Sequence, residues 1–284
     1  MKTLGYYDGA YGPLDEMTIP MSDRVCWFGD GVYDAGPCRN YHVFAMDEHV
    51  DRFYRSASFL DIRIPMEKAE WKELLNELVH KMDDGNLFVY YQVTRGVGAD
   101  KKRSHVYEAG VPGKLWVTLT PATVDDGIKP ISLVTTEDTR FLHCNIKTLN
   151  LIPSVMASQK AKDAGCQEAV FYRPGEIVTE CAHSNIHILK NGELWTHPAD
   201  HLILGGIARL HLIRACEALH IPVHQECFSL KELFEADEVI VTSSSNLCRH
   251  ANVIDQKPVG GKSPELLETI RAYLLDEFKQ ATEA

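Results

Sequence analysis

Hydrophobic and polar positions follow two different periods in the first half of this chain. The segment 42–62 predicts a short strand followed by an amphipathic helix with Asp47 as its N-cap, because the apolar residues after Asp47 recur at helical spacing. A second amphipathic helix is predicted over 67–82. The apolar runs 87–96 and 114–122 instead predict buried strands. The first half is therefore expected to mix helices and strands.

The second half repeats this mixture. A helix is expected over about 150–164, because Pro153 is tolerated in a first helical turn and Gly165 is a C-terminal stop signal. Asn191 and Gly192 form a strong hairpin signal between two apolar segments. The remaining expected strands and helices follow in chain order: strands over 131–138, 168–172, 177–190 and 237–242, and helices over 205–219 and 263–280.

A tract rich in Pro, Asp and Gly at 120–131 is the candidate linker. It predicts an N-terminal domain over 1–120, a linker over 121–130 and a larger C-terminal domain over 131–284. At 284 residues the chain is long enough for two domains with their own cores.

Composition and charge exclude several classes of protein. The net charge of -11 argues against nonspecific binding to nucleic acid or to an anionic membrane. No signal peptide and no membrane span is expected, so a soluble cytoplasmic protein is predicted. The eight cysteines contain no C-x-x-C pair, which favours free thiols. Three H-x-x-x-H pairs lack the glutamate of a zinc protease motif, so no metal is expected.

Two loops favour binding of a single anion. Gly205 and Gly206 precede a helix, whose first amides would point unpaired at an anion. The strand that ends at 242 is followed by three residues with small hydroxyl groups, Ser243, Ser244 and Ser245. Each loop alone could be simple turn chemistry, but together they suggest a cup for one phosphate.

Several motifs then carry a resemblance to a known family: FGDGVYDA, VYYQVTRG, NIKTLNLIPSVMA, EAVFYRPGEIVTECAHSNIHIL, LGGIARLHLI and EVIVTSSSN. The chain resembles the D-amino-acid transaminases, a branch of the fold-type IV enzymes that use pyridoxal 5'-phosphate. The resemblance covers nearly the full length. It implies an α+β fold with a small α/β N-terminal domain and a larger, barrel-like C-terminal domain that carries the reactive lysine.

The resemblance implies that Lys147 forms the Schiff base with the cofactor and is the catalytic base and acid. A lysine beside a cationic ring in a partly desolvated pocket loses its proton easily, and a neutral amine can attack an imine. Glu180 would pair with the pyridine nitrogen and so keep the ring an electron sink. From the residues alone, Lys147 could be a solvated surface lysine and Glu180 a solvated strand glutamate, although the apolar Val178 and Ala182 on the same face favour burial.

The remaining cofactor contacts are also implied by the resemblance. Arg52 matches the family's phosphate-binding arginine, although helical periodicity alone would make it an exposed arginine. It would add a positive charge to the cup. The other phosphate contacts would come from Ile207, Ala208, Ser243 and Ser244.

Substrate recognition is implied by a third set of residues. Tyr33 would face the substrate, and Arg103 and His105 resemble the Arg-x-His carboxylate trap of this branch. In the family this loop reaches across from the partner subunit, so a homodimer is expected. Without the resemblance, the loop would be interpreted as a basic surface loop, since Lys101, Lys102 and Arg103 form a charged run.

The expected reaction is D-alanine plus 2-oxoglutarate giving pyruvate plus D-glutamate by a ping-pong route. Branched-chain L-aminotransferases and aminodeoxychorismate lyase share the Lys and Glu machinery and remain alternatives. A non-catalytic relative would be expected to lack Lys147 or Glu180, and both are present.

Overall fold

The computed structural model describes residues 1–283, and its contacts divide the chain into two compact units. Unit 1 comprises residues 1–123, 146–150 and the C-terminal end from 279, and unit 2 comprises 124–145 and 151–278. The chain leaves unit 1 within the predicted linker. The segment that carries Lys147 groups with unit 1, whereas the sequence prediction assigned it to the C-terminal domain.

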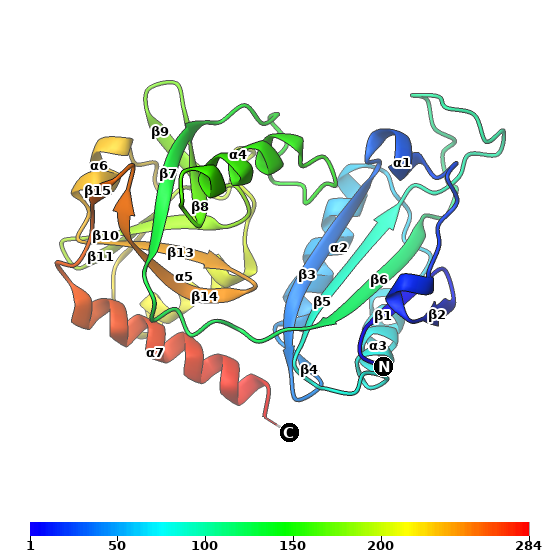
Figure 1. The fold of residues 1–284 in the computed structure, drawn as a ribbon, viewed down its shortest axis with the longest axis horizontal. Coiled ribbons are helices and arrows are strands. Elements are labelled where there is room, and N and C mark those ends of the chain that lie inside the picture. The colour runs from blue at the N-terminus through cyan, green and yellow to red at the C-terminus, as the bar shows by residue number, and fades with distance from the viewer. Residues whose placement is uncertain (284) are drawn as a thin grey trace. The chain divides into compact units, whose positions relative to one another are not determined.

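Unit 1 contains a six-stranded sheet of order β2-β1-β6-β5-β3-β4 (Figure 1). All of its neighbouring strands are antiparallel. The strands are β1 (Leu4–Tyr7), β2 (Ala10–Gly12), β3 (Gly31–Arg39), β4 (His42–Val43), β5 (Leu87–Thr94) and β6 (Lys114–Pro121). The central strands β3, β5 and β6 pair over most of their length, so they form the rigid part of this unit.

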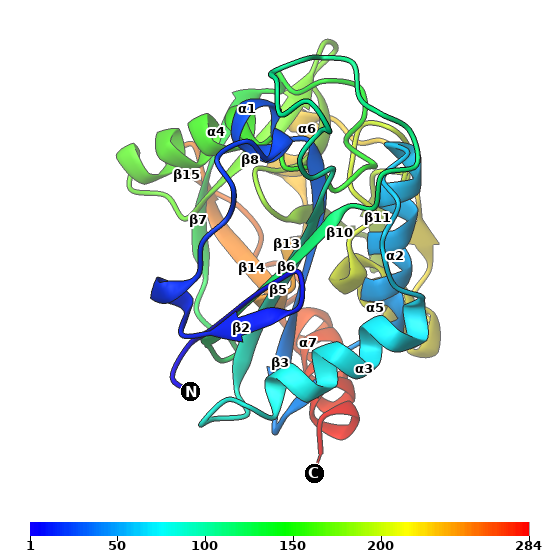
Figure 2. The ribbon, with the colours of Figure 1, turned by 90° about the vertical axis from the view of Figure 1, so that its right-hand side faces the viewer.

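Three α-helices belong to unit 1: α1 (Arg24–Phe28), α2 (Met46–Phe59) and α3 (Lys68–Val79). A short 3-10 helix, η1, spans Leu14–Glu16. Figure 2 shows α2 and α3 along one face of the sheet. There Phe53 stacks on Trp71, and both rings contact the buried Tyr91 edge-on. These aromatic contacts form the centre of the unit 1 core.

The predicted helices of unit 1 are present, but the predicted cap of the first is wrong. Asp47 lies inside the first turn of α2, and Ala45 occupies the cap position in a left-handed conformation (φ 50°). Asp47 still places a negative charge near the positive end of the helix dipole. At the start of α3, the Glu67 amide donates to the Glu70 carboxylate (2.9 Å), which closes a capping box.

Unit 2 contains a nine-stranded sheet of order β12-β11-β10-β13-β14-β7-β8-β9, with β15 paired to β14. Figure 1 shows these strands curling around a common interior, and the core side chains come from most of them. The strands are β7 (Ile131–Glu137), β8 (Glu168–Arg173), β9 (Ile177–Cys181), β10 (Asn185–Lys190), β11 (Glu193–Thr196), β12 (Val223–His224), β13 (Glu238–Ser243), β14 (Asn246–Ile254) and β15 (Lys257–Pro258). The predicted hairpin at Asn191–Gly192 joins β10 to β11.

The helices of unit 2 are α4 (Ile152–Asp163), α5 (Ile207–Ala218), α6 (Leu230–Glu235) and α7 (Pro264–Ala281), the last turn of α7 grouping with unit 1. Pro153 lies in the first turn of α4, as predicted. Gly165 follows that helix at φ +72°, a conformation that glycine adopts without strain. Small side chains of α4, Ala157 and Ala161, pack against Ala169 and Phe171 of β8.

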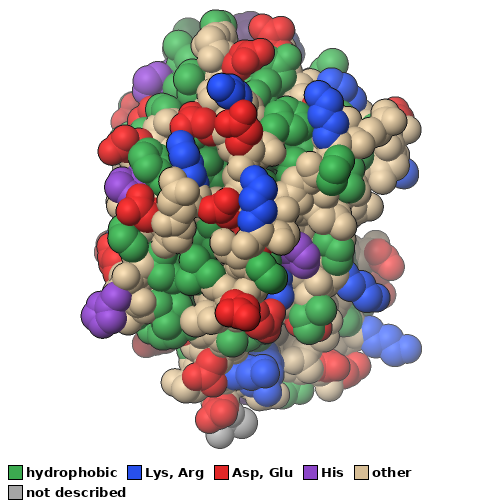
Figure 3. Space-filling view, turned by 90° about the vertical axis from the view of Figure 1, so that its left-hand side faces the viewer, with side chains coloured by type: hydrophobic (Ala, Val, Ile, Leu, Met, Phe, Trp, Pro, Cys, Tyr) green, Lys and Arg blue, Asp and Glu red, His purple; other side chains and the backbone are tan. Residues whose placement is uncertain are grey.

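The distribution of surface charge and the state of the cysteines are as the composition predicts. On the face drawn in Figure 3, acidic and basic side chains are interspersed rather than gathered by sign. All eight cysteines are free.

Over residues 1–283, the structure has no helix that is both long and apolar enough to cross a bilayer. The same residues contain no cluster of three or more His, Cys, Asp or Glu side chains suited to a metal ion.

Candidate functional site

The lysine segment 146–150 lies along the N-terminal part of strand β3 of unit 1, before the two residues that pair with β4. The Tyr33 amide donates to the Lys147 carbonyl (2.9 Å), and the Leu149 amide donates to the Gly31 carbonyl (3.1 Å). On its other side, the Lys147 amide donates to Ser56 Oγ of α2 (3.3 Å). The backbone at Lys147 is therefore fixed by a strand and by a helix, although no helix or strand contains it.

The Lys147 side chain lies against an aromatic pair. Its Nζ is 4.3 Å from the centroid of the Tyr33 ring, which in turn stacks on Tyr90 (5.4 Å between centroids). Lys147 is partly buried, so the fully solvated alternative does not describe it. The structure thus brings together Lys147 and Tyr33, two of the residues predicted for the site.

Arg52 is buried in the same unit, and its exposure expected from periodicity is wrong. Its Nε and one terminal nitrogen donate to the two oxygens of Asp34 (2.7 and 2.8 Å), and His49 Nδ1 lies 2.7 Å from the same carboxylate. All three side chains are at most 3% exposed. Because Asp34 lies on β3 beside Tyr33, this ion pair joins α2 to the strand that carries the Lys147 contact.

The ionisation of this cluster follows from burial and charge. Burial raises the pKa of Asp34, but the adjacent Arg52 and His49 outweigh it, and the pKa lies below its usual value. Burial lowers the pKa of His49, and the attraction of Asp34 offsets this only in part. The Asp34 carboxylate is therefore the fixed negative charge that orients the Arg52 guanidinium. Neither Asp34 nor His49 was predicted from the sequence.

Arg103 and His105 lie in the long loop between β5 and β6, and both are exposed. The structure brings them together on one ring: the Arg103 guanidinium carbon is 4.8 Å from the Phe28 centroid, and the His105 ring is 5.0 Å from it. Phe28 is the last residue of α1. Both side chains therefore pack against α1 rather than against Tyr33 or Lys147.

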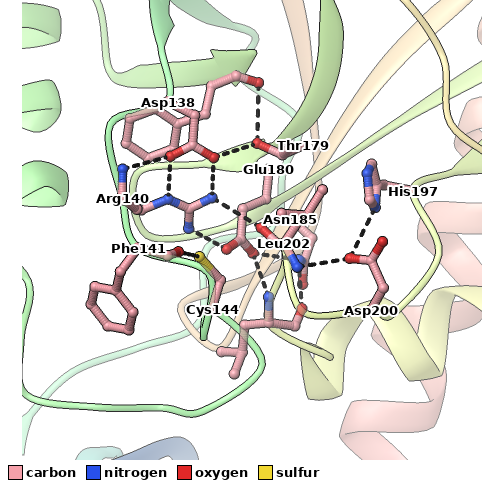
Figure 4. A network of polar contacts seen from close by, with 12 residues as sticks. Asp138, Arg140, Phe141, Cys144, Thr179, Glu180, Asn185, His197, Asp200 and Leu202 are labelled. Carbon is pink, nitrogen blue, oxygen red and sulfur yellow. Dashed lines mark hydrogen bonds and ion pairs between the residues drawn. The ribbon is translucent and has the colours of Figure 1, made fainter. Parts of the chain in front are cut away.

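In unit 2, the Glu180 carboxylate lies at the centre of the polar network drawn in Figure 4. Arg140 donates to Oε1, while the Asn185 side chain (2.9 Å) and the Leu204 amide (3.0 Å) donate to Oε2. Glu180 is 5% exposed. The alternative of a solvated strand glutamate is therefore wrong, and burial on the apolar face of β9 is confirmed.

Arg140, like Asp34 and His49, was not predicted from the sequence. Its guanidinium forms two parallel hydrogen bonds with Asp138 (both 2.9 Å) in addition to its bond with Glu180. It also lies over the Phe171 ring, 4.5 Å from the centroid. The only sequence signal is the Asp-Thr-Arg run directly after β7, which resembles an ordinary polar loop.

Asp138 holds Arg140 in place. It accepts further hydrogen bonds from Thr179 Oγ1 (3.0 Å) and Arg173 Nε (3.1 Å). Burial raises the pKa of Asp138, but its hydrogen bonds with Arg140 and the surrounding positive charge outweigh this and leave the pKa below its usual value. A chain of paired charges therefore runs from Asp138 through Arg140 to Glu180.

The predicted anion cup is the second feature of unit 2. Gly206 precedes α5 with an extended backbone, and no side chain caps this helix in the described part of the chain. The amides of Ile207 and Ala208 therefore lie in a first helical turn, where amides have no intrahelical partner. A Cβ on Gly206 would lie 2.1 Å from Asn185 Oδ1, so only glycine fits beside that amide.

The hydroxyl cluster lies near the same asparagine. Asn185 pairs with Thr242 across β10 and β13, and Ser243 ends β13 at the following position. Ser243 Oγ accepts a hydrogen bond from the Ser245 amide (3.3 Å), and Ser244 occupies the turn between them. Asn185 thus connects Glu180, the start of α5 and the end of β13. The structure brings the predicted unit 2 residues into one region.

A model of the family described as amino-transferase class IV matches residues 31–254. A protein named D-alanine aminotransferase from Listeria monocytogenes serotype 4b (strain F2365) is 39% identical over 274 residues, covering 94% of this chain and 93% of the relative. A protein of the same name from Bacillus licheniformis is 35% identical over 268 residues, covering 93% and 92%.

Solved structures show the same fold. A branched-chain aminotransferase from Thermoproteus uzoniensis, solved with norvaline, has a TM-score of 0.86 at 21% identity and covers 98% of this chain and 96% of its own. The branched-chain amino acid aminotransferase from Escherichia coli has a TM-score of 0.88 at 20% identity and covers 100% and 96%. At this identity the likeness is evidence for the fold alone.

Proposed function

Since the chain belongs to the class IV aminotransferase family, we propose that it transfers amino groups between D-amino acids and 2-oxo acids with pyridoxal 5'-phosphate. The predicted α+β fold of fold-type IV and the aminotransferase class are confirmed. The proposed reaction is D-alanine plus 2-oxoglutarate giving pyruvate plus D-glutamate, by a ping-pong route. The observation that supports the substrate most directly is the similarity, over nearly the full length, to proteins named D-alanine aminotransferase.

The residues of unit 2 fit the two polar ends of this cofactor. The Ile207 and Ala208 amides and the hydroxyls of Ser243 and Ser244 are the donors that a phosphate requires. Asn185 lies so close to Gly206 that a Cβ at this position would collide with it. The residue is therefore restricted to glycine, and no side chain covers the backbone there. At the other end, a buried carboxylate such as Glu180 suits a protonated pyridine nitrogen.

Arg52 would add a positive charge to the phosphate group. Its guanidinium is oriented by Asp34 through two hydrogen bonds, and Asp34 is held in turn by His49. Asp34 compensates the burial of the arginine and fixes the direction of its guanidinium, whose charged N–H groups would then donate to the phosphate.

Lys147 would hold the cofactor covalently until the amino group of the substrate takes its place, and the amine freed by that exchange would then move the proton at the substrate α-carbon. When bound, the cofactor supplies an electron sink for the bond that is broken at that carbon. Glu180 would hold a proton at the ring nitrogen, and Arg140 and Asn185 fix the direction of its carboxylate. Tyr33 lies beside the amine and would limit access of water to it.

The substrate carboxylate would be bound by Arg103 and His105. An arginine can donate two parallel hydrogen bonds to a carboxylate, and an adjacent imidazole can donate a third. Their common position on Phe28 supports this role, since it keeps the two donors close together. A trap of this kind would select substrates by the position of the carboxylate, and so by their configuration.

We further propose that the active form is a homodimer. Helix α4 exposes an apolar stripe at helical spacing, formed by Ile152 (70% exposed), Val155 (59%) and Met156 (68%). Phe141 and Leu142 of the same unit are exposed as well. Contiguous apolar surface of this kind is typical of a protein interface. Sedimentation equilibrium would test this, and a monomer at assay concentrations with full activity would refute it. A cytoplasmic location remains a prediction from the sequence.

The test of the function is a two-substrate assay. Purified protein with pyridoxal 5'-phosphate is expected to release at most one equivalent of pyruvate per site from D-alanine alone. Continuous release is expected only when 2-oxoglutarate is present, with D-glutamate then formed in equal amount to the further pyruvate. L-alanine and L-leucine are run in parallel. Preference for L-leucine would instead indicate the branched-chain alternative, and formation of pyruvate from aminodeoxychorismate would indicate the lyase.

The matched pair for this assay is Lys147→Ala and Lys231→Ala. Lys231 is exposed on α6 and has no proposed role in the reaction or in the dimer interface. The Lys147 variant is expected to lose more than a thousandfold in rate, since both cofactor attachment and proton transfer would be removed. Equal rates for the two variants would contradict the proposal.

A further inference from the structure

The loop that carries Arg103 and His105 is long and has no regular secondary structure. It connects β5, which ends at Thr94, to β6, which begins at Lys114. Residues of the loop line a cavity of about 370 Å³ together with Arg24 and Arg95. Residues 99–110 are all exposed, so apolar burial contributes little to holding the loop, and its course depends on polar contacts.

Arg24 supplies these contacts. Its Nη1 donates to the carbonyl oxygens of Ser104 (2.5 Å) and Val106 (3.4 Å), and its Nη2 donates to that of His105 (3.4 Å). Three consecutive carbonyls thus converge on one guanidinium. Arg24 is 7% exposed, although the loop residues that it binds are exposed.

Asp30 fixes the direction of Arg24. It accepts a hydrogen bond from Arg24 Nε (2.7 Å) and two from Arg95 Nε (2.9 and 3.1 Å). One carboxylate therefore orients two largely buried arginines, and its single charge compensates only one of the two positive charges. The backbones are joined as well, since the Arg95 amide donates to the Asp30 carbonyl (2.9 Å).

Arg95 holds the second half of the loop. Its guanidinium carbon is 3.7 Å from the centroid of the Tyr107 ring, a stacked cation–π contact. Its terminal nitrogens donate to the carbonyls of Leu60 (2.6 Å) and Asp61 (3.2 Å), and the Tyr107 hydroxyl donates to Asp61 Oδ2 (3.1 Å). The loop is thus fastened on both sides of His105.

We propose that Arg24, oriented by Asp30 and supported by Arg95, is a positioning residue that fixes residues 104–106 so that Arg103 and His105 present their donors together to the substrate carboxylate. The proposal rests on the function proposed above for Arg103 and His105. Arg24 itself does not contact substrate in this scheme. It acts through the backbone of the loop. The side chains of Arg103 and His105 pack on Phe28, which lies on the same short helix as Arg24.

The first test does not depend on activity. Trypsin cleaves after Lys101, Lys102 and Arg103, which lie just before the three bound carbonyls. Arg24→Gln is expected to raise the rate of cleavage at these bonds at least tenfold, because the loop loses its main polar contacts. The matched control is Arg55→Gln, an exposed arginine on α2. Equal cleavage of the Arg24 variant, the control and the unaltered protein would overturn the proposal.

The second test uses kinetics and a double variant. Arg24→Gln is expected to raise KM for D-alanine about tenfold, with a smaller effect on kcat. In a background that already carries Arg103→Gln and His105→Gln, the same substitution is expected to have little further effect on KM, because the positioned donors are gone. An equal fold-increase in KM on Arg24→Gln in both backgrounds would overturn a positioning role.

These outcomes separate the inference from the function on which it rests. If Arg103→Gln and His105→Gln leave KM unchanged, the carboxylate trap is refuted, and with it the positioning role, although trypsin still reports whether Arg24 holds the loop. Arg24→Lys provides a second variant in case the glutamine variant fails to fold. It keeps a charge for Asp30, but one ammonium cannot reach Asp30 and three carbonyls together, so it is expected to show the same increases in cleavage and KM.

Discussion

The Arg140 guanidinium donates to the Glu180 carboxylate although the two residues are forty positions apart, and both side chains are largely buried in unit 2. Burial of a charged group is tolerated only when a partner of opposite charge and enough hydrogen bonds compensate it. Here Asp138 accepts two further hydrogen bonds from the same guanidinium, so Arg140 and the two carboxylates form one hydrogen-bonded network.

This arrangement predicts that Arg140→Met is strongly destabilising. Loss of the guanidinium leaves two buried carboxylates without their main partner, which is expected to cost about 3–5 kcal/mol of unfolding free energy. The control is Arg173→Met, since Arg173 is more exposed and makes a single hydrogen bond to Asp138. Urea unfolding of both variants measures the difference, and equal losses would show that Arg140 does not carry the network.

The contact at Gly206 predicts a matched pair of glycine variants. Gly206→Ala would place a Cβ 2.1 Å from Asn185 Oδ1 and is expected to lower stability by about 1–3 kcal/mol. It is also expected to weaken binding of pyridoxal 5'-phosphate, measured by absorbance titration, because Asn185 must move. At Gly205→Ala the nearest atom would be 4.0 Å away, so this variant is expected to bind normally. Equal cofactor affinity of both variants would argue against the cup.

The buried histidines predict that the protein loses stability in mild acid. His187 is fully buried between Thr196 and Thr242, and burial, with the nearby Arg209, holds its pKa well below its usual value. Below about pH 6.5 the unfolded chain therefore binds a proton at this position that the folded chain does not. Stability then falls as the pH falls, by up to about 1.4 kcal/mol per pH unit for this one group.

The measurement is urea unfolding at pH 7.5, 6.0 and 5.0. His187→Gln is expected to reduce the slope of stability against pH by about one proton, and His42→Gln, which removes an exposed imidazole on β4, is the control. His49 shifts in the same direction and supplies part of the remaining slope. An unchanged slope in the His187 variant would contradict the assignment.

The free thiols predict a simple pattern of reactivity. Cys26 and Cys227 are exposed, whereas burial raises the pKa of Cys38, Cys216 and Cys248 to about 12 each. Two thiols are expected to react quickly with a disulfide reagent at pH 8, and the buried ones only after unfolding. Cys26→Ser combined with Cys227→Ser should remove the fast phase, and a fast phase that persists would mean that a buried segment opens readily.

Short-range patterns in the sequence predicted the local structure well. Pro153, Gly165 and the Asn191–Gly192 hairpin lie where expected, because each signal depends on the conformation of a few neighbouring residues. The cap at Asp47 failed because the helix begins at Met46, one residue earlier, after Ala45 in a left-handed conformation that an alanine side chain does not favour and that the sequence therefore does not indicate.

Long-range pairing could not be predicted in the same way. Periodicity made Arg52 an exposed helix arginine, and only the position of Asp34 on a neighbouring strand explains its burial. Arg140 gave no signal, since its partner Glu180 follows forty residues later. Lys147 was assigned to the C-terminal domain because the chain passes into unit 1 for only five residues, 146–150.

The loop over residues 104–106 is held through its carbonyl oxygens, and every amino acid has one. The side chain at Val106 is therefore not tied to the course of the loop, whereas the Ser104 hydroxyl accepts a hydrogen bond from the Val106 amide (3.2 Å). Position 106 is a natural place to diversify the chain in a search for altered substrate preference, while Arg24, Asp30 and Ser104 should be left intact.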